Sequence, residues 1–413
     1  MKPGARRSFL KKTLVASGAL LAWPWLAHGQ GQSGLPAGLL AQQGDIFSFV
    51  RQQLLLADGL VYLNTGSLGP SPRWTIDRII EIMHQLEANP VTENWGPLGR
   101  QMELAREKAA GFLGAATDEI VLTRNTTEGL SLVGASLHLQ KGDEILTTNH
   151  EHPGGLVGLR YLARKAGARL VEIPMPMPAL SQEEVLDVIE QHLNKHTKML
   201  MLSHVSTITG MRMPWPAIAS LVQGRDILLV ADGAQAPGML AVDVKALGVD
   251  VYATSGHKWL LGPKETGVVY FKKAIQDRIK PVFTDSGYAT YSASSGTRNV
   301  ANIIALGATF DWLQKVGMPA IEAHVMQLAD YAYQRLAALP GVELLSPAAP
   351  ELRTALVSIR LTKANNRQVF QALLEQGIVV KVLPKYNALR FSHHLFNTTN
   401  DVDILLQALE KLV

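Results

Sequence analysis

The 413-residue sequence contains no cysteine, and aromatic residues make up only 6% of it. The absence of cysteine excludes disulfide bonds, thiolate metal sites and a catalytic cysteine. Charged residues are also sparse, at 18%, whereas hydrophobic residues reach 47%. These proportions are those of an ordinary globular protein rather than a disordered or fibrous one. The length predicts a large domain together with a smaller one.

The positive charge of the chain is concentrated at its N-terminus. The formal net charge is +4, but residues 1–29 hold five basic residues and no acidic one, so the remainder has a net charge of −1. A nearly neutral body has no basic stripe that would attract a phosphate backbone. The sequence therefore argues against a nucleic-acid partner.

Residues 1–29 have the pattern of an export signal. A basic segment precedes an apolar run at 13–26, which Pro24 interrupts and which is too short for a convincing membrane span. The pair Arg6-Arg7 before Phe9 resembles a twin-arginine signal. We expect the twin-arginine export machinery to carry the folded protein to the periplasm, with no stable membrane span after cleavage. A general secretory signal or a basic membrane anchor is the alternative.

The remaining chain divides into a lead-in with one helix at 30–60, a large domain at 61–290 and a small C-terminal domain at 291–413. In the large domain, apolar strand patterns alternate with helical ones; the predicted strands are 61–63, 120–123, 144–147, 169–173, 197–203, 227–231, 251–254 and 267–271. Such alternation predicts an α/β fold with a mostly parallel sheet covered on both faces, and ligands in such folds bind beyond the carboxyl ends of the strands.

The small domain is predicted to be α+β. Long helical patterns at 300–316 and 319–339 precede a set of strands that reads as antiparallel, at 342–345, 356–361, 378–381 and 388–392. No internal repeat is present.

Lys258 is the residue that points most directly to a chemistry. It follows a predicted strand in the segment 253–259, beside Ser255, Gly256 and His257, and before a Gly-Pro turn. A lysine held there is partly desolvated, which lowers its pKa and frees its amine to attack a carbonyl. Pyridoxal phosphate (PLP) uses such a lysine as its Schiff-base anchor. A solvated surface lysine is the alternative.

Three further loops at predicted strand ends carry groups that suit the same cofactor. The loop 124–129 opens a helix with two hydroxyls, a natural phosphate cradle, or else a plain helix cap. The loop 149–153 offers a ring that can stack on a pyridine; metal binding by His150 and His152 is the alternative. Asp232 leaves an apolar strand where a buried carboxylate can pair with a pyridine nitrogen, or is a turn aspartate.

Taken together, Asp232, Lys258, the two upstream loops and the segment 62–70 resemble the class V aminotransferase-like family of fold-type I PLP enzymes. This family includes cysteine desulfurases, isopenicillin N epimerase and kynureninase. The resemblance covers about residues 62–409, and the segment 62–70 is most similar to the isopenicillin N epimerase branch. It implies a large domain with a mostly parallel seven-stranded sheet, a smaller α+β C-terminal domain, and a homodimer.

The resemblance also implies a role for each matching residue. Lys258 would form the Schiff base, Asp232 would pair with the ring nitrogen and His152 would stack on the ring as the three catalytic residues. Gln235 would bind the phenolic oxygen of the ring, and Arg390 would hold the substrate α-carboxylate. The other expected contacts are Asn125, Thr126, Thr127, Ser255 and His257 to the cofactor, Gly296 and Thr297 to the phosphate of the neighbouring subunit, and Asn64 and Ser67 to the substrate.

The sequence departs from the family at several positions. Cysteine desulfurases need a nucleophilic cysteine before the Arg390 strand, and the stretch 382–387 has none, which excludes desulfuration through an enzyme persulfide. Thr207 stands where many relatives have asparagine, which puts that contact with the phenolic oxygen in doubt. His393 and His394 are read as substrate contacts or, equally, as surface residues at a strand end.

The resemblance implies that Lys258, once displaced by an incoming amino acid, acts as base at Cα. Three outcomes then stay open: transamination, epimerisation and β-elimination. The signal and the core also resemble those of a periplasmic PLP enzyme that tailors pyoverdine siderophores, and we expect aminotransferase-type chemistry, with a siderophore side chain as a candidate substrate. A PLP-fold binding protein without activity, and a metal hydrolase using His150, His152 and Asp232, are the remaining alternatives.

Overall fold

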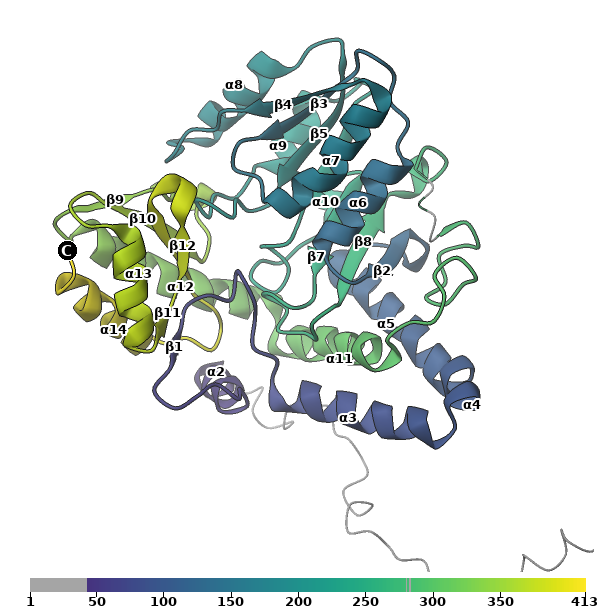
Figure 1. Ribbon diagram of the computed structural model, residues 1–413, viewed down its shortest axis with the longest axis horizontal. Coiled ribbons are helices and arrows are strands. Elements are labelled where there is room, and N and C mark those ends of the chain that lie inside the picture. Colours follow the sequence, from purple (N-terminus) through teal and green to yellow (C-terminus); the bar gives the residue numbers. More distant parts are fainter. Residues whose placement is uncertain (1–42, 280, 282–283) are drawn as a thin grey trace, which may run out of the picture. The chain divides into compact units, whose positions relative to one another are not determined.

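The computed structural model describes residues 43–279, 281 and 284–413 (Figure 1). The predicted export signal at 1–29 lies outside the described residues, as do residues 30–42 of the predicted lead-in. Within the described ranges, no helix combines the length and the apolar character needed to cross a membrane.

The central element is a seven-stranded sheet with the strand order β2-β8-β7-β6-β5-β3-β4 (Figure 1). Its members are β2 (Ile120–Thr123), β3 (Glu144–Thr148), β4 (Arg169–Ile173), β5 (Thr197–Ser203), β6 (Leu228–Asp232), β7 (Val251–Ser255) and β8 (Gly267–Phe271). Strands β3 to β7 pair in parallel, and β8 runs antiparallel to both of its neighbours. The predicted α/β fold with a mostly parallel seven-stranded sheet is therefore confirmed.

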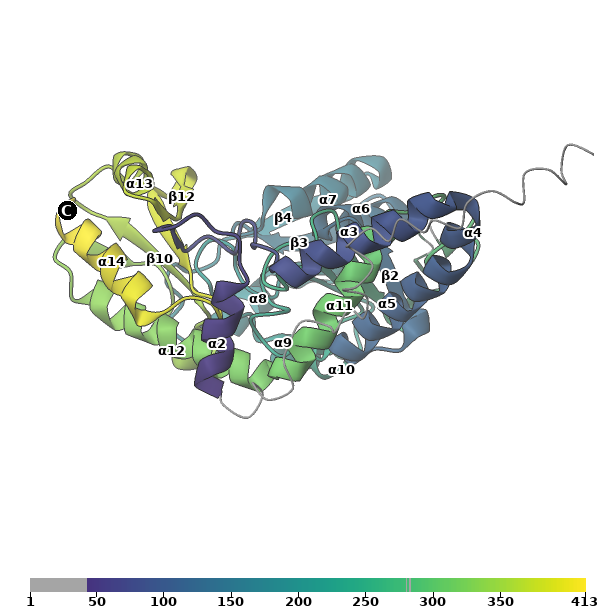
Figure 2. The ribbon, with the colours of Figure 1, turned by 90° about the horizontal axis from the view of Figure 1, so that it is seen from below.

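Both faces of this sheet are buried, as the continuous apolar runs of the strands predict. Along β5, Met199 and Met201 pack into a core with α6 (Thr126–Ser136) and α7 (Pro153–Ala166), whereas Leu200 and Leu202 pack into the core on the other face. Helices α6 and α7 lie side by side on one face (Figure 1), and α9 (Trp215–Leu221) and α10 (Val244–Leu247) lie on the opposite face (Figure 2).

Helix boundaries coincide with residues that favour them. Pro153 opens α7, the His152 side chain caps its first turn, and Gly167 ends it in the left-handed conformation at φ 66°. The N-terminal helices are α2 (Gln43–Gln52), α3 (Arg73–Ala88), α4 (Pro90–Trp95) and α5 (Pro97–Leu113), and α8 (Gln182–His192) lies between β4 and β5. Short 3-10 turns occur at Thr117–Glu119, Lys273–Ile275, Pro350–Leu352 and Pro384–Tyr386.

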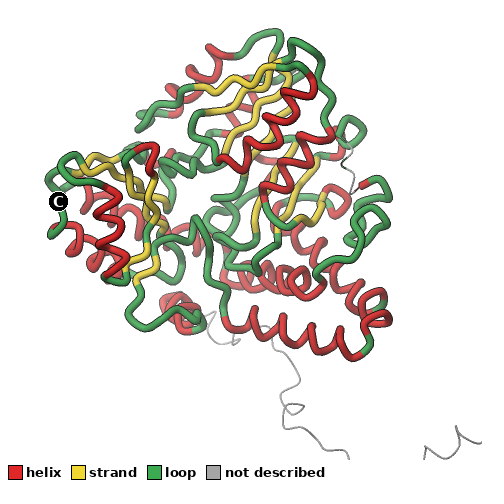
Figure 3. Tube along the Cα trace, in the orientation of Figure 1, coloured by secondary structure: helices red, strands yellow, loops and turns green. Residues whose placement is uncertain are grey.

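The C-terminal part forms a smaller four-stranded sheet in the order β12-β13-β10-β9, which is antiparallel throughout. Its strands are β9 (Val342–Leu344), β10 (Leu356–Leu361), β12 (Lys381–Leu383) and β13 (Ala388–Ser392). Figure 3 shows strands of this part in yellow near the C-terminus. The accompanying helices are α11 (Val300–Val316), α12 (Met318–Ala337), α13 (Asn366–Glu375) and α14 (Thr399–Glu410). This agrees with the α+β character expected of the segment.

One predicted strand of this part is wrong. The stretch 378–381 is not a single antiparallel strand, because it splits into β11 (Ile378–Val379) and β12, with Val380 between them. Strand β11 pairs in parallel with β1 (Val61–Tyr62), which the sequence assigned to the large domain. Helix α11, assigned to the small domain, packs against α3 and α5. The boundary at residue 290 stays a prediction. The contacts of β11 with β1, and of α11 with α3 and α5, connect the two sides of it.

Candidate active site

Five loops meet at the carboxyl edge of the large sheet. Strands β2, β3, β5, β6 and β7 point the same way, so the residues that follow them share one edge. These residues begin at Arg124, Asn149, His204, Gly233 and Gly256. The four loops predicted from the sequence are therefore brought together, and a fifth, after β5, joins them.

Lys258 lies in a tightly bonded turn after β7. Gly256 N donates to Thr266 O at 2.7 Å, and Gly69 N donates to His257 O at 2.7 Å. Burial lowers the pKa of Lys258 to about 8, while the negative charge of Asp232 partly opposes this shift. A substantial fraction of the amine is therefore neutral near pH 8, as a Schiff-base lysine requires.

Asp232 ends β6 and is only 6% exposed. Its Oδ1 accepts a hydrogen bond from Ala234 N at 2.9 Å, and burial raises the pKa of the carboxyl. No ion pair joins it to any cation of the described chain. A buried carboxylate in this state is suited to a cationic partner from a ligand, and a protonated pyridine nitrogen is one.

The start of α6, which the sequence predicts to be a phosphate cradle, lies against the end of β7. Ser255 Oγ accepts from Thr126 N at 3.0 Å and lies 2.7 Å from Thr126 Oγ1. The Asn125 side chain caps the helix by accepting from Glu128 N at 2.9 Å, so it orders the cradle. Thr127 is exposed at the rim. Burial lowers the pKa of His257 to about 4, so its ring is neutral and can donate one hydrogen bond.

His152 lies at the start of α7, as predicted. Its Nδ1 accepts from Gly154 N at 3.1 Å, which leaves Nε2 as the protonated nitrogen. Burial lowers the pKa of His152, and the nearby charges of Lys258 and Asp232 act on it in opposite directions. The ring is therefore a neutral aromatic surface beside the anchor lysine. Stacking on a pyridine stays a prediction.

Glu151 is a buried carboxyl that the sequence analysis did not single out. It is 7% exposed and accepts hydrogen bonds from the hydroxyls of Thr148 and Ser203. Burial raises the pKa of Glu151 to about 7, and the neighbouring Asp232 contributes in the same direction. Thr148 also accepts from His150 N, so this group fixes the turn that presents His152. The sequence signal that could have identified Glu151 is its position between two histidines directly after a strand.

Arg390 on β13 is the predicted carboxylate-binding residue, and the structure gives it the required properties. It is 2% exposed, and Nη1 donates to both O and Oγ1 of Thr207, at 2.8 and 2.7 Å. Nη2 donates to Ser67 Oγ at 3.3 Å, whereas the buried Nε has no partner among the described residues. Burial lowers the pKa of Arg390 to about 10. A buried guanidinium with no paired carboxylate in the described chain suits an anionic ligand.

Thr207 thus has a role that the sequence analysis missed, because it positions Arg390 through its own oxygens. Gln235 is likewise occupied: its Nε2 donates to Gly66 O at 2.8 Å, and its Oε1 accepts from Trp259 Nε1 at 2.7 Å. Gln235 therefore joins the Lys258 turn to the segment 64–70. The predicted contact between Gln235 and the ring oxygen stays a prediction.

The segment 64–70 passes between the Lys258 turn and Arg390. A Cβ on Gly66 would lie 2.9 Å from Gln235 Oε1 and 3.0 Å from Arg390 Nη2, and a Cβ on Gly69 would collide with the carbonyl oxygen of Lys258. The buried Asn64 Oδ1 has no partner within the described chain. Asn64 and Ser67, predicted to contact substrate, therefore lie beside Arg390's strand, which Asn64 bridges at Ser392.

The predicted residues at 296 and 297 do not join this group. Gly296 and Thr297 are both exposed, and a Cβ on Gly296 would meet nothing within 4 Å. This is the position expected of residues that act on a neighbouring subunit, and that role stays a prediction.

Three histidines whose roles were left open by the sequence analysis are buried: His150, His393 and His394. His393 and His394 are both 0% exposed, so their interpretation as surface residues is wrong; His394 Nε2 lies 2.7 Å from Trp259 O. His150 packs edge-on against Tyr386. Among the described residues, no group of three or more His, Asp or Glu side chains could hold a metal ion.

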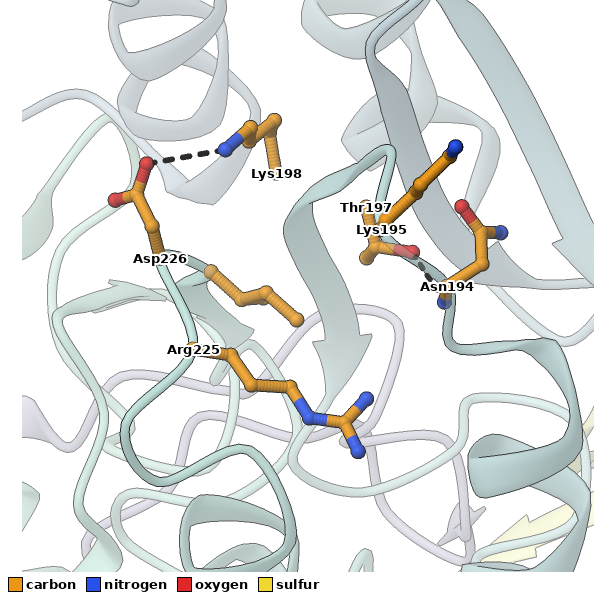
Figure 4. A pocket seen from close by; sticks show the side chains of 7 residues that line it. Asn194, Lys195, Thr197, Lys198, Arg225 and Asp226 are labelled. Carbon is orange, nitrogen blue, oxygen red and sulfur yellow. Dashed lines mark hydrogen bonds and ion pairs between the residues drawn. The ribbon is translucent and has the colours of Figure 1, made fainter.

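A hollow of about 310 Å³ lies elsewhere, where β5 and β6 begin (Figure 4). Its Lys198 and Asp226 form an ion pair at 3.2 Å, and Asn194 N donates to Thr197 Oγ1 at 3.1 Å. It is at the opposite edge of the sheet from Lys258 and contains none of the predicted site residues.

Comparison with known proteins agrees with this arrangement. The family described as aminotransferase class V matches residues 61–405. A "Probable cysteine desulfurase" of Halalkalibacterium halodurans is 31% identical over 384 residues, covering 85% of this chain and 93% of its own length. "Isopenicillin N epimerase" of Amycolatopsis lactamdurans is 30% identical over 392 residues, covering 88% and 97%.

Solved structures of similar fold include a cystine C-S lyase in complex with cysteine persulfide, with a TM-score of 0.77 and 25% identity over 86% of this chain and 98% of the other. A cysteine desulfurase from Escherichia coli has a TM-score of 0.77 and 27% identity, covering 90% and 99%. A variant of the lyase carries glycine covalently linked to its PLP cofactor. Lys258, Asp232 and the Thr126–Ser255 cradle fit that cofactor, and the chain belongs to the class V aminotransferase family of PLP-dependent enzymes.

Proposed function

We propose that this chain is a PLP-dependent enzyme acting at the amino group and Cα of an amino acid or of a metabolite that contains one. Aminotransferase-type chemistry is the proposed reaction, and the side chain of a siderophore such as pyoverdine is the proposed setting. The observation that carries the proposal is the placement of Lys258, Asp232 and Arg390 around one edge of the sheet.

Each of these residues has a defined task. Arg390 binds the α-carboxylate through the guanidinium atoms that face the site, which orients the Cα–H bond. Lys258 Nζ, with a pKa of about 8 caused mainly by burial, is the base that takes the proton from Cα. Asp232 holds a proton at the ring nitrogen. The bound cofactor supplies an electron sink for the charge left on Cα.

Two other reactions share these steps. Epimerisation is favoured by the similarity to isopenicillin N epimerase, and β-elimination by the similarity to the cystine C-S lyase. Several relatives are named cysteine desulfurases. A reaction through a persulfide on an enzyme cysteine is excluded here, because the sequence has no cysteine.

The proposed setting is the periplasm, reached through the twin-arginine machinery, and the proposed assembly is a homodimer. The pair Arg6-Arg7 supports the first, and the exposed Gly296 and Thr297 support the second. Replacing Arg6 and Arg7 by lysine should retain the protein in the cytoplasm. Light scattering of the purified protein should give twice the mass of one chain, and a monomer would contradict the dimer.

The test of the proposed function is incubation of the PLP-loaded protein with a panel of amino acids and peptides, followed by mass spectrometry and chiral separation. A keto product indicates transamination, an inverted stereocentre epimerisation, and a released side-chain fragment β-elimination. The expected result is a keto product that depends on Lys258. Failure to develop a visible absorption band with PLP would contradict all three reactions.

A further inference from the structure

Lys381 is a second cation in the substrate half of the site. It opens β12 and lies directly opposite Arg390 on β13, as the register Lys381↔Arg390 shows. Directly opposed residues in an antiparallel pair project to the same face of the sheet. The other neighbour of Arg390 in this row is Ser358, whose Oγ donates to Ile208 O at 2.6 Å, next to Thr207. Lys381 therefore shares the face that is turned to the active site.

The charge of Lys381 acts on the residues of the site. Burial is the main cause of the lowered pKa of both Lys258 and His152, and the positive charge of Lys381 adds to each shift. The pKa of Lys381 itself is lowered by partial burial and by Arg390. Lys381 itself is exposed, and its ammonium group lies near enough to Arg390, Lys258 and His152 for their charges to interact.

This pair of cations is uncompensated. Like charges directly opposite each other destabilise a sheet. The structure records no hydrogen bond or ion pair of the Lys381 side chain with any residue of the described ranges, and the Arg390 side chain pairs with oxygens of Thr207 and Ser67 rather than with a carboxylate. By contrast, Arg360 on the neighbouring strand is paired with Glu343 at 2.9 Å. Neither Lys381 nor Arg390 has an acidic partner in the described part of the chain, and both lie at the proposed substrate site. This arrangement indicates that the substrate carries two anionic groups.

We propose that the substrate is an acidic amino acid, or a metabolite presenting one, whose second carboxylate is bound by Lys381 while Arg390 binds the α-carboxylate. This inference rests on the proposed function and narrows its substrate class. Lys381 is then a specificity-determining residue. An ammonium group suits this role because it is a compact charge on a flexible stem and can follow side chains of different length.

The test uses dicarboxylates without an amino group, which cannot react. Binding of succinate and glutarate to the PLP-loaded protein is measured by calorimetry beside their monoamides, succinamate and glutaramate. The expected result is that one dicarboxylate binds about tenfold more tightly than its monoamide, the size of one hydrogen bond to a charged group. Lys381→Met should reduce this ratio to about one, and Lys381→Arg should keep it.

Lys385→Met is the matched control, because Lys385 lies on the same hairpin with its ammonium 5.3 Å from the Tyr386 ring centre. It should leave the ratio unchanged. Equal affinities in the unsubstituted protein, including no binding of either compound, would overturn the inference. So would a preference that survives in Lys381→Met, or a variant in which both affinities fall equally, since Lys381 would then bind the α-carboxylate. A retained PLP absorption band together with a keto product from the amino-acid panel would show that the proposed function stands even where the inference fails.

Discussion

Two sides of the site differ in how their polar groups are satisfied. On the side of β6 and β7, here called the anchor side (Asp232 and 255–258), Ser255 binds Thr126, the His257 carbonyl accepts from Gly69, and Asp232 accepts from Ala234. On the hairpin side (Lys381 and Arg390), Arg390 Nε has no partner in the described chain. An unpaired buried polar group calls for an explanation, and a ligand that completes it is one.

The difference indicates that the two sides receive different kinds of partner. The anchor side is preorganised for a cofactor that stays bound. The hairpin side is completed by a substrate, which binds and leaves in each turnover. The four predictions below test this division through three substitutions at or next to one side and one pH titration.

The largest effect is expected for Lys258→Ala on the anchor side. Loss of the amine that binds the cofactor and takes the Cα proton should lower turnover by about 10³-fold or more. The visible absorption band should disappear as well. Lys264→Ala is the control, because Lys264 Nζ donates to Gly69 O at 3.1 Å close to this turn. Turnover by Lys258→Ala above a tenth of normal would contradict the assigned base.

On the hairpin side, Arg390→Met should lower kcat/KM by on the order of 100-fold through loss of a charge-assisted contact to the α-carboxylate. The absorption band should be retained, because Arg390 is not an anchor residue. Stopped-flow spectra with and without amino acid measure both quantities. If the band were lost together with kcat/KM, the two sides would not be separable.

The pH dependence of cofactor capture tests the state of Lys258 before loading. Burial lowers its pKa to about 8, from an ordinary value of 10.5. Below that pKa the neutral fraction falls by about tenfold per pH unit. Capture of PLP by the cofactor-free protein should therefore rise with pH and level off near pH 8. A rate that still climbs towards pH 10 would show that the lysine is not desolvated.

The smallest effect is expected for Trp259→Phe, which removes the indole donor to Gln235 at 2.7 Å. Trp215→Phe is a matched control, since Trp215 is also fully buried but its Nε1 has no partner among the described residues. Both changes remove similar volume, so the extra loss of unfolding free energy in Trp259→Phe should be about 1 kcal/mol. Denaturant titration measures it, and equal losses would show that the hydrogen bond from Trp259 to Gln235 does not stabilise the protein.

The features that the sequence predicted share a physical basis. Strands such as β5 and β6 are buried on both faces, so their apolar runs are continuous and their ends are marked by polar residues. Parallel strands bring those ends to one edge, and this placed Asp232 near Lys258. The helix starts at Thr126 and Pro153 carried local capping signals.

The features that it missed depend on contacts between distant segments. Strand β11 has two residues, too few for a periodic pattern, and its partner β1 lies more than three hundred positions away. The pairing of Thr207 with Arg390 and the contact of the buried His393 with Ala355 both join segments that are far apart in the sequence. Composition and spacing within one segment carry no signal for these.

The contacts of Gly66 and Gly69 restrict how this enzyme can evolve. A side chain at position 66 would press against both Gln235 and Arg390, and one at position 69 would collide with the Lys258 turn. The segment that carries them therefore cannot drift towards a new substrate without disturbing the anchor lysine. Lineages that acquire new specificity should instead vary the β12–β13 hairpin, where Lys381 is exposed, while the two glycines stay invariant.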